Sequence, residues 1–218
     1  MSNDRARAEA LLADLAVSRE TWDRLEVFVA HLAKWQKAQN LVGPGTLDDI
    51  WLRHVSDSLQ LLPLIRECRT IADIGSGAGF PGLVLAIALA DADPAKRPVI
   101  HLIESNRRKA AFLRSAARET KVQVTVHSER VEAVLADAAD KGVAPDVLTA
   151  RALAPLHQLF EMTQPALKNH VVCLFHKGRG FDMELSEARR YWNFEADIIQ
   201  SRVADDSVIV RISHVTPL

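Results

Sequence analysis

Residues 71–82, IADIGSGAGFPG, hold four of the nine glycines in this 218-residue chain, together with one acid, Asp73. Glycine permits left-handed turns and lets a backbone come close to a ligand. A carboxylate beside such a loop favours a ligand with positive groups and disfavours a phosphate. The segment therefore predicts a small-molecule site in which Asp73 acts through its charge.

Two cofactors compete for this loop. Residues 77–82 satisfy G-x-G-x-x-G, and Glu104 follows about 20 residues later, so an NAD-linked oxidoreductase is admissible by pattern. A pyrophosphate binds N–H donors, however, and Asp73 would repel it. If the motif begins at Gly75, it becomes acid-x-Gly-x-Gly-x-Gly, which suits the ammonium and sulfonium groups of S-adenosylmethionine. Glu104 would then accept hydrogen bonds from the ribose hydroxyls.

The elements that position the loop follow from the pattern after Thr70. Short apolar runs alternate with helical stretches, from TIADIG (70–75) to VVCLFHKG (171–178). This βα repetition predicts an α/β fold with a mainly parallel, Rossmann-like sheet, closed by an antiparallel hairpin of residues 194–200 and 208–214. The glycine loop would lie at the carboxyl edge of that sheet, where open α/β folds bind ligands.

The first part of the chain is predicted to be helical. Apolar residues recur every three to four positions between residues 25 and 35, which indicates one long helix. After the Gly/Pro break at residues 40–45, Thr46 is expected to cap a second helix that runs towards Pro63. We expect an N-terminal helical extension (1–68) and an S-adenosylmethionine-binding domain (69–218), packed as one unit.

Composition limits the class of protein and its partners. The chain is 48% hydrophobic and 25% charged, which is typical of a globular protein, and it has no apolar run of about 18 residues and no signal-peptide core. A cytoplasmic protein without a membrane partner is expected. The net charge of −1 means that nucleic acid must bind to a local basic patch. Cys68 and Cys173 are interpreted as free thiols without a chemical role, and no metal site is expected.

Several basic residues are candidates for such a local patch. Arg107, Arg114, Arg118 and Lys121 share one helical face, which fits either phosphate contact or, more often, a solvated surface. Arg151 ends the predicted fourth strand, at the same sheet edge as the glycine loop, and there it fits the site of methyl transfer.

Two further groups are candidates for substrate binding. Lys177 and Arg179 follow the fifth strand, also at that edge of the sheet. His54, Asp57 and Ser58 fall on one helical face. They are interpreted as a hydrogen-bonded junction between the N-terminal helices and the sheet, because no glycine elbow surrounds the serine.

Taken together, these motifs resemble a known bacterial family. The chain is similar to the family of small-subunit ribosomal RNA methyltransferase G, also called glucose-inhibited division protein B. The motifs that carry this resemblance are, in chain order, NLVG, WLRHVSDSLQLLP, IADIGSGAGFPG, LIESNRRKAAFL, SERVEAV, DVLTARALAPL and LFHKG. The resemblance covers roughly residues 31 to 213 and implies the fold of a class I S-adenosylmethionine methyltransferase that modifies N7 of one guanine in the decoding-region loop of 16S rRNA. Together with the loop chemistry, it gives as cofactor residues Asp73, Gly75, Gly77, Gly79, Phe80, Glu104, Val131, Glu132 and Arg151.

The residues agree with this chemistry. The fourth strand runs into TARALAPL, not into the Asn/Asp-Pro-Pro-aromatic loop that methylation of an exocyclic amine calls for, and neither cysteine lies in a loop suited to attack on cytosine. Guanine N7 has a free lone pair, so no catalytic base is required and catalysis reduces to positioning. A monomer acting on 16S rRNA or on the 30S particle is expected. An NAD-linked oxidoreductase and a catalytically silent RNA-binding assembly factor remain as alternatives. The residues expected at the RNA are His54, Asp57, Ser58, Arg151, Lys177 and Arg179.

Overall fold

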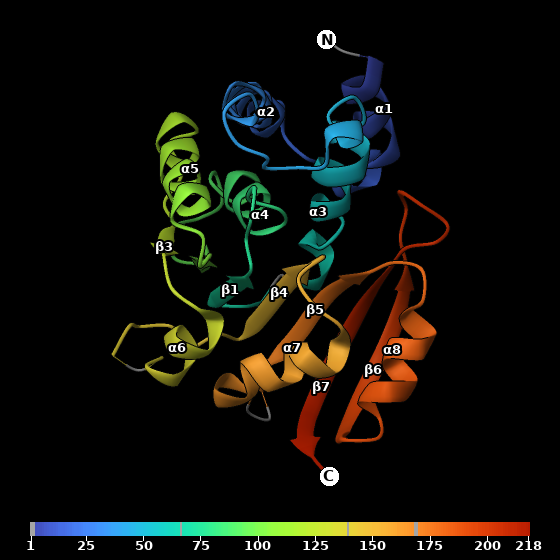
Figure 1. Ribbon diagram of the computed structural model, residues 1–218. Coiled ribbons are helices and arrows are strands. Elements are labelled where there is room, and N and C mark those ends of the chain that lie inside the picture. Colours follow the sequence, from blue (N-terminus) through green and yellow to red (C-terminus); the bar gives the residue numbers. More distant parts are fainter. Residues whose placement is uncertain (1–2, 66, 139, 168–169) are drawn as a thin grey trace.

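A seven-stranded sheet forms the centre of the computed structural model, which describes residues 3–65, 67–138, 140–167 and 170–218 (Figure 1). The strand order is β3-β2-β1-β4-β5-β7-β6. Strands β1 to β5 are parallel, β7 runs antiparallel to β5, and β6 pairs with β7. The predicted α/β fold with its closing hairpin is confirmed. The strands are β1 (Thr70–Ile74), β2 (Val99–Ile103), β3 (Thr125–His127), β4 (Val147–Arg151), β5 (Val172–Lys177), β6 (Trp192–Gln200) and β7 (Val208–Pro217).

Helices cover both faces of the sheet (Figure 1). One face carries α4, α5 and the N-terminal helices, and the other carries α6, α7 and α8, so that each face has its own hydrophobic core. The helices are α1 (Asn3–Leu11), α2 (Arg19–Gln36), a π-helix η3 (Trp51–Ser56), α3 (Asp57–Leu59), α4 (Gly82–Ala88), α5 (Arg107–Glu119), α6 (Val131–Ala136), α7 (Leu156–Thr163) and α8 (Phe181–Ala188). Four short 3₁₀ turns are η1 (Ala13–Leu15), η2 (Pro44–Thr46), η4 (Leu62–Leu64) and η5 (Gln164–Ala166).

The sheet has a topological switch point between β1 and β4. Strand β1 leads through α4 to β2 on one side, whereas β4 pairs with β1 on the other side. The last four residues of β1 are all buried, as expected for a parallel strand covered on both faces. In such sheets the crevice beyond the carboxyl ends of the two central strands is the usual ligand site.

The N-terminal helices pack against the helices that cover one face of the sheet. Helix α2 begins after Ser18, whose hydroxyl accepts a hydrogen bond from the Thr21 N–H at 3.1 Å, and the helix lies against α4 and α5. The predicted cap at Thr46 is wrong, because the Thr46 hydroxyl donates to the Gly43 carbonyl at 2.8 Å and residues 44–46 form a 3₁₀ turn. The second helix instead opens with η3. None of the helices in the described residues is both long and apolar enough to cross a membrane.

Candidate functional site

The loop after β1 requires glycine at three positions. Gly75, Gly77 and Gly79 have φ angles of 66°, 54° and 94°, in the left-handed region that other residues rarely adopt. A Cβ atom at Gly75 would lie 2.6 Å from a methyl carbon of Leu153, in the loop after β4. The glycines therefore let the loop turn back sharply and let the loop after β4 pack against it.

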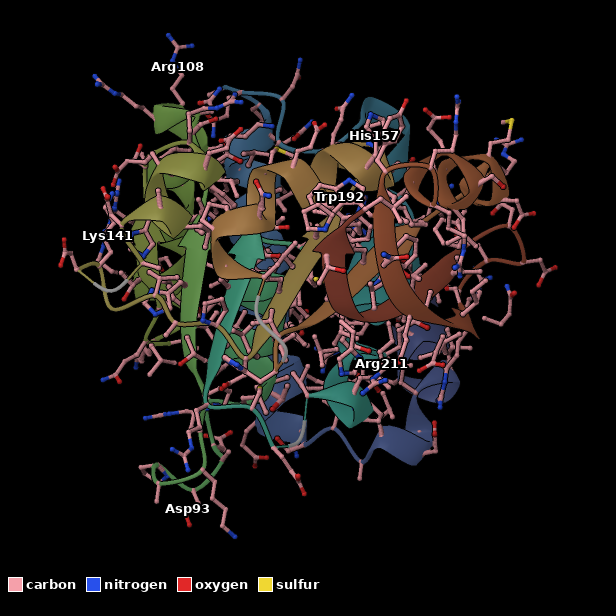
Figure 2. The ribbon with its side chains drawn as sticks, turned by 90° about the horizontal axis from the view of Figure 1, so that it is seen from below. Asp93, Arg108, Lys141, His157, Trp192 and Arg211 are labelled. Atoms are coloured by element: carbon pink, nitrogen blue, oxygen red, sulfur yellow. The ribbon has the colours of Figure 1, made fainter. Side chains whose placement is uncertain are left out.

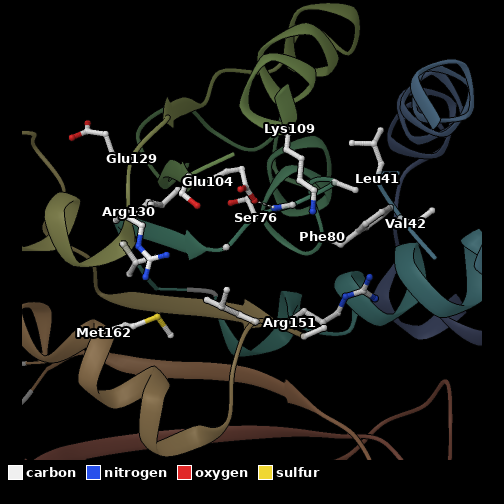
Figure 3. Close-up of a pocket in the computed structure, with 18 of the residues that line it drawn as sticks. Leu41, Val42, Ser76, Phe80, Glu104, Lys109, Glu129, Arg130, Arg151 and Met162 are labelled. Atoms are coloured by element: carbon white, nitrogen blue, oxygen red, sulfur yellow. Dashed lines mark hydrogen bonds between the residues drawn. The ribbon is translucent and has the colours of Figure 1, made fainter. Parts of the chain in front are cut away.

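A cavity of about 420 Å³ lies in front of this loop, at the carboxyl edge of the sheet. This volume falls in the range of small-molecule sites. Its wall is formed by the glycine loop, the end of β2, the start of α6, the loop after β4 and the loop after α2 (Figure 3). Of the predicted cofactor residues, those that line it are Gly75, Gly77, Phe80, Glu104, Val131, Glu132 and Arg151.

Glu104 is held rigidly in the cavity wall, just beyond β2. Its carboxylate accepts the N–H of Gly77 at 2.9 Å and the N–H of Asn106 at 2.7 Å. A carboxylate offers about four acceptor positions, so acceptor capacity remains for two further donors. The arrangement fits a vicinal diol such as that of a ribose.

Glu132 and Val131 stand together at the start of α6. Val131 is 8% exposed and gives the cavity an apolar surface. One carboxylate oxygen of Glu132 lies 3.2 Å from Arg130, and the other is buried without a hydrogen-bond partner among the described residues. An apolar side chain beside an unused acceptor is suited to an aromatic ring that carries an amino group.

Asp73 lies behind the glycine loop rather than in the cavity wall. The residue is fully buried, and its Oδ1 accepts the Thr149 hydroxyl of β4 at 2.7 Å. Its Oδ2 has no hydrogen-bond partner in the described part of the chain. Burial raises the pKa of Asp73 to about 6, although polar contacts with Thr149, Ser76 and the Gly82 backbone and the charge of Arg151 act in the opposite direction. Asp73 can act on a ligand only through its charge across the loop.

A stack of three side chains closes the other end of the cavity. The His54 ring lies on the Phe80 ring with 4.9 Å between centroids, and the Arg151 guanidinium carbon is 5.2 Å from the centroid of Phe80. Arg151 also donates to the Arg53 carbonyl at 2.8 Å and contacts Nδ1 of His54. Burial, reinforced by the charge of Arg151, lowers the pKa of His54 to about 3, so His54 is neutral at neutral pH and can accept from Arg151.

A second cavity, of about 430 Å³, lies beyond the loop that follows β4. The two cavities share Arg151, Ala152 and Leu153 in their walls. Asp57 lines the second cavity and lies 3.4 Å from Arg151. The shared wall places this second cavity, which polar and apolar side chains line together, directly beside the cofactor-sized one.

Lys177 holds one side of the second cavity together. Its ammonium donates to the Ala154 carbonyl at 2.8 Å and to Glu184 at 2.7 Å. Burial lowers the pKa of Lys177, and the bond to Glu184 opposes that change. The same Glu184 accepts the Leu156 N–H at 3.0 Å, so the loop after β4 is tied to β5 and α8.

Besides Asp73, three predicted residues lie outside both cavities. Ser58 donates to the His54 carbonyl at 2.7 Å, as expected for a residue of a hydrogen-bonded junction, but it is fully buried and does not reach either cavity. The Arg179 side chain is 89% exposed and pairs with Asp206 at 3.2 Å. Gly79 supports the loop from behind, where a Cβ would lie 2.9 Å from Leu83.

Sequence reasoning missed several residues of the first cavity. Lys109 enters from α5, Arg130 from the turn before α6 and Met162 from α7, while Leu41 and Val42 approach from the loop after α2 (Figure 3). The motif NLVG contains the last two, so the resemblance carried a signal for them. Lys109 follows Glu104 closely in sequence, but helical spacing alone does not indicate that its side chain points into the cavity.

Comparison with known proteins gives a consistent picture. Residues 21–207 match the GidB family, described as rRNA small subunit methyltransferase G. The chain is 49% identical to ribosomal RNA small subunit methyltransferase G of Methylobacterium sp. (strain 4-46), over 98% of this chain and 97% of that protein. It is 45% identical to the protein of the same name from Paramagnetospirillum magneticum, over 95% and 96%.

Solved structures share the fold at low sequence identity. Cofactor-bound Rv0187 from MTB has a TM-score of 0.62 at 13% identity and covers 98% of each chain. An O-methyltransferase from Bacillus cereus in complex with SAH has a TM-score of 0.58 at 13% identity, over 94% of this chain and 96% of the other. These likenesses identify the sheet and helices as a methyltransferase-type fold.

Proposed function

The chain belongs to the rRNA small subunit methyltransferase G family, and from that premise we propose that it transfers the methyl group of S-adenosylmethionine to N7 of a guanine in the decoding-region loop of 16S rRNA. The observation that carries the proposal is the pair of adjoining cavities with a common wall at residues 151–153. One has the size and polar groups for the methyl donor. The other offers a chamber beside it for the target base.

The side chains in and behind the wall of the first cavity fit S-adenosylmethionine. Glu104 would accept from the ribose hydroxyls, and Val131 with Glu132 would contact the adenine. Asp73 would stabilise the cationic end of the cofactor from behind the loop, where its unpartnered Oδ2 is otherwise buried at a cost. The bound cofactor supplies an electrophilic methyl group, and the protein orients it towards the second cavity.

The chemistry of N7 places few demands on the protein. The N7 lone pair lies in the plane of the base and attacks the methyl carbon directly, so no proton has to be removed first. The work of the site is to align the two reactants and to exclude water. Arg151 and Asp57, at the boundary of the second cavity, are the groups that we assign to holding the guanine.

Cysteine chemistry is disfavoured by the state of both thiols. Burial raises the pKa of Cys173 to about 12 and that of Cys68 to about 11, so neither is a thiolate at neutral pH. Cys173 lies inside β5, away from any loop. This supports transfer to a ring nitrogen over transfer to carbon 5 of cytosine.

The test is methyl transfer from radiolabelled S-adenosylmethionine to small-subunit RNA and to 30S particles, both taken from cells that lack this protein. Label is expected in one guanine of the 16S rRNA. Borohydride reduction followed by aniline cleavage then reports N7, because the alkylated ring carries a positive charge. Comparison of the two substrates shows whether naked RNA or the assembled particle is used.

A matched pair of glycine variants controls the assay. Gly75→Val places a side chain against Leu153 and abolishes transfer, whereas Gly45→Val, at a position with no neighbour within 4 Å, keeps it. RNA binding by the wild-type protein without incorporation of label would favour a silent assembly factor. Binding of NAD without binding of S-adenosylmethionine would favour an oxidoreductase. Label on an exocyclic amine or on another base would overturn the N7 assignment.

A further inference from the structure

A third hollow lies at the opposite edge of the sheet from the cofactor cavity. It has a volume of about 860 Å³ and runs beside the starts of β2 and β3, along the C-terminal half of α5. Figure 2 labels Arg108, near the start of α5, and Asp93, in the segment between α4 and β2, at opposite sides of the molecule. We call it the basic groove, because its charged lining residues are Arg97, Arg114, Arg118 and Lys121, with no aspartate or glutamate among them.

The four cations of the basic groove have no acidic partner among the residues that the structure describes. None of them forms an ion pair within the described ranges, although fifteen such pairs occur elsewhere in them. Two are oriented by backbone carbonyls: Arg97 donates to Ala90 at 2.9 Å and Arg114 donates to Val126 at 3.0 Å. In a chain with a net charge of −1, such a one-signed concave surface concentrates positive potential.

Lys121 adds an independent observation. Its φ is 55°, in the left-handed region, at the position after the α5 cap where helices usually place glycine or asparagine. The N–H of Lys121 bonds to the Arg118 carbonyl at 3.2 Å, which fixes the two basic residues next to each other. The helix dipole accounts for a cation in the last turn of α5. It does not account for Arg114, about one turn earlier on α5, or for Arg97, which lies just before β2.

Helix α5 connects the basic groove with the cofactor cavity. Lys109 in its first turn lines that cavity, and Arg118 in its last turn lines the groove. The helix has 13 residues and is therefore about 20 Å long. A single nucleotide cannot span this distance, whereas a folded or extended stretch of RNA can.

We propose that the basic groove binds the phosphate backbone of the substrate RNA, at the opposite edge of the sheet from the cavities where the methyl group is transferred. The inference rests on the proposed function, because RNA is the polyanion that this family meets. Guanidinium groups match the geometry of phosphate oxygens and supply most positioning contacts in such complexes. The groove would hold a part of the 16S rRNA outside the target loop and so fix the register of the substrate.

The test compares the double variant Arg118→Gln/Lys121→Gln with a control double variant, Arg7→Gln/Arg189→Gln. Each pair removes two positive charges, and both residues of the control are exposed and lie outside the three cavities. Binding of full-length 16S rRNA is measured between 50 and 300 mM salt. The slope of log K against log salt should fall by about 1.4 to 1.8 for the groove variant and stay unchanged for the control, since each phosphate contact contributes about 0.7 to 0.9.

A short RNA hairpin that carries only the target loop separates this inference from the proposed function. The groove variant should methylate the hairpin with wild-type kcat/KM and should show a raised KM on full-length RNA. Equal slopes and equal KM values for the groove variant and the wild type on full-length RNA would overturn the groove assignment while methyl transfer stands. The groove assignment would likewise be overturned if the groove variant bound RNA as the wild type does but lost binding to anionic vesicles or to an acidic protein. Failure of the wild type to methylate any RNA would sink the proposed function instead.

Discussion

Replacement of Asp73 by asparagine tests how the loop recognises a cationic cofactor. In the free protein, burial raises the pKa of Asp73 to about 6, so the carboxyl group is largely protonated below that pH. A bound sulfonium and ammonium favour the ionised form and bring the pKa back towards its usual value of about 3.9. Binding of S-adenosylmethionine is therefore expected to release a proton from Asp73 and to strengthen as the pH rises through 6.

The size of the effect follows from these two pKa values. With a pKa of about 6, roughly one tenth of Asp73 is ionised at pH 5 and nine tenths at pH 7. If the pKa in the complex is near 3.9, the dissociation constant should be about 10-fold higher at pH 5 than at pH 7. The full shift of about two units corresponds to about 3 kcal/mol, so Asp73→Asn should weaken binding at pH 7 by up to about 100-fold.

Calorimetric titration of S-adenosylmethionine between pH 5 and pH 7 measures this dependence. The α-amino group of the cofactor, with a pKa near about 8, stays protonated over that range. S-adenosylhomocysteine, which lacks the sulfonium charge, should show a smaller slope. Asp197→Asn, which changes an exposed carboxylate on β6, should keep both affinity and slope. An affinity that is independent of pH in the wild type, or an unchanged slope in Asp73→Asn, would refute the reasoning.

The remaining predictions concern stability and RNA. Because the pKa of Asp73 is raised in the folded protein, the stability that this residue contributes is lost as the pH rises from about 3.9 through 6. Asp73→Asn should therefore raise the free energy of unfolding of the free protein at pH 7.5 by up to about 3 kcal/mol. Urea titrations should show this gain at pH 7.5 and no difference below pH 4. Gly82→Ala would place a Cβ 2.6 Å from Asp73 and should cost about 1–3 kcal/mol in the same assay, whereas Gly45→Ala, with open space around it, should cost little. Lys121→Gly should keep or raise Tm, because it relieves a left-handed backbone position, and should still weaken binding of 16S rRNA; a fall in both would indicate a structural role. Arg151→Lys should slow single-turnover methyl transfer by about 10-fold, because an ammonium cannot reproduce the guanidinium stack and its several hydrogen bonds.

Much of the fold could be predicted because its signals are local. The alternation of apolar strands and helical segments specifies βα units, and the position of the glycine loop follows from its place between one strand and the next helix. The error at Thr46 has a physical cause. A threonine hydroxyl can bond backwards to a carbonyl in a turn as well as forwards to a helix N–H, and spacing does not distinguish the two.

The site was less predictable than the fold. Because the last four residues of β1 are all buried, there is no alternation of polar and apolar residues to show that Asp73 points behind the loop. Spacing placed His54, Asp57 and Ser58 on one helical face, but η3 is a π-helix, and Ser58 is buried while the other two line different cavities. Met162 reaches the first cavity from α7, which is remote from the glycine loop in sequence. Lys109 reaches it from α5, and the direction of its side chain depends on how that helix packs.

The buried carboxylate also explains why the loop discriminates between cofactors. Ionised Asp73, with an unpartnered oxygen, destabilises the free fold at neutral pH, and a cation on the far side of the glycine loop recovers part of that free energy on binding. A pyrophosphate in the same place would raise the cost of ionisation further and would bind best when Asp73 is protonated, so its affinity would fall as the pH rises. The sign of the pH dependence therefore separates a methyl donor from a dinucleotide, whatever their absolute affinities. Asp73→Asn should weaken binding of the methyl donor and would strengthen binding of a dinucleotide.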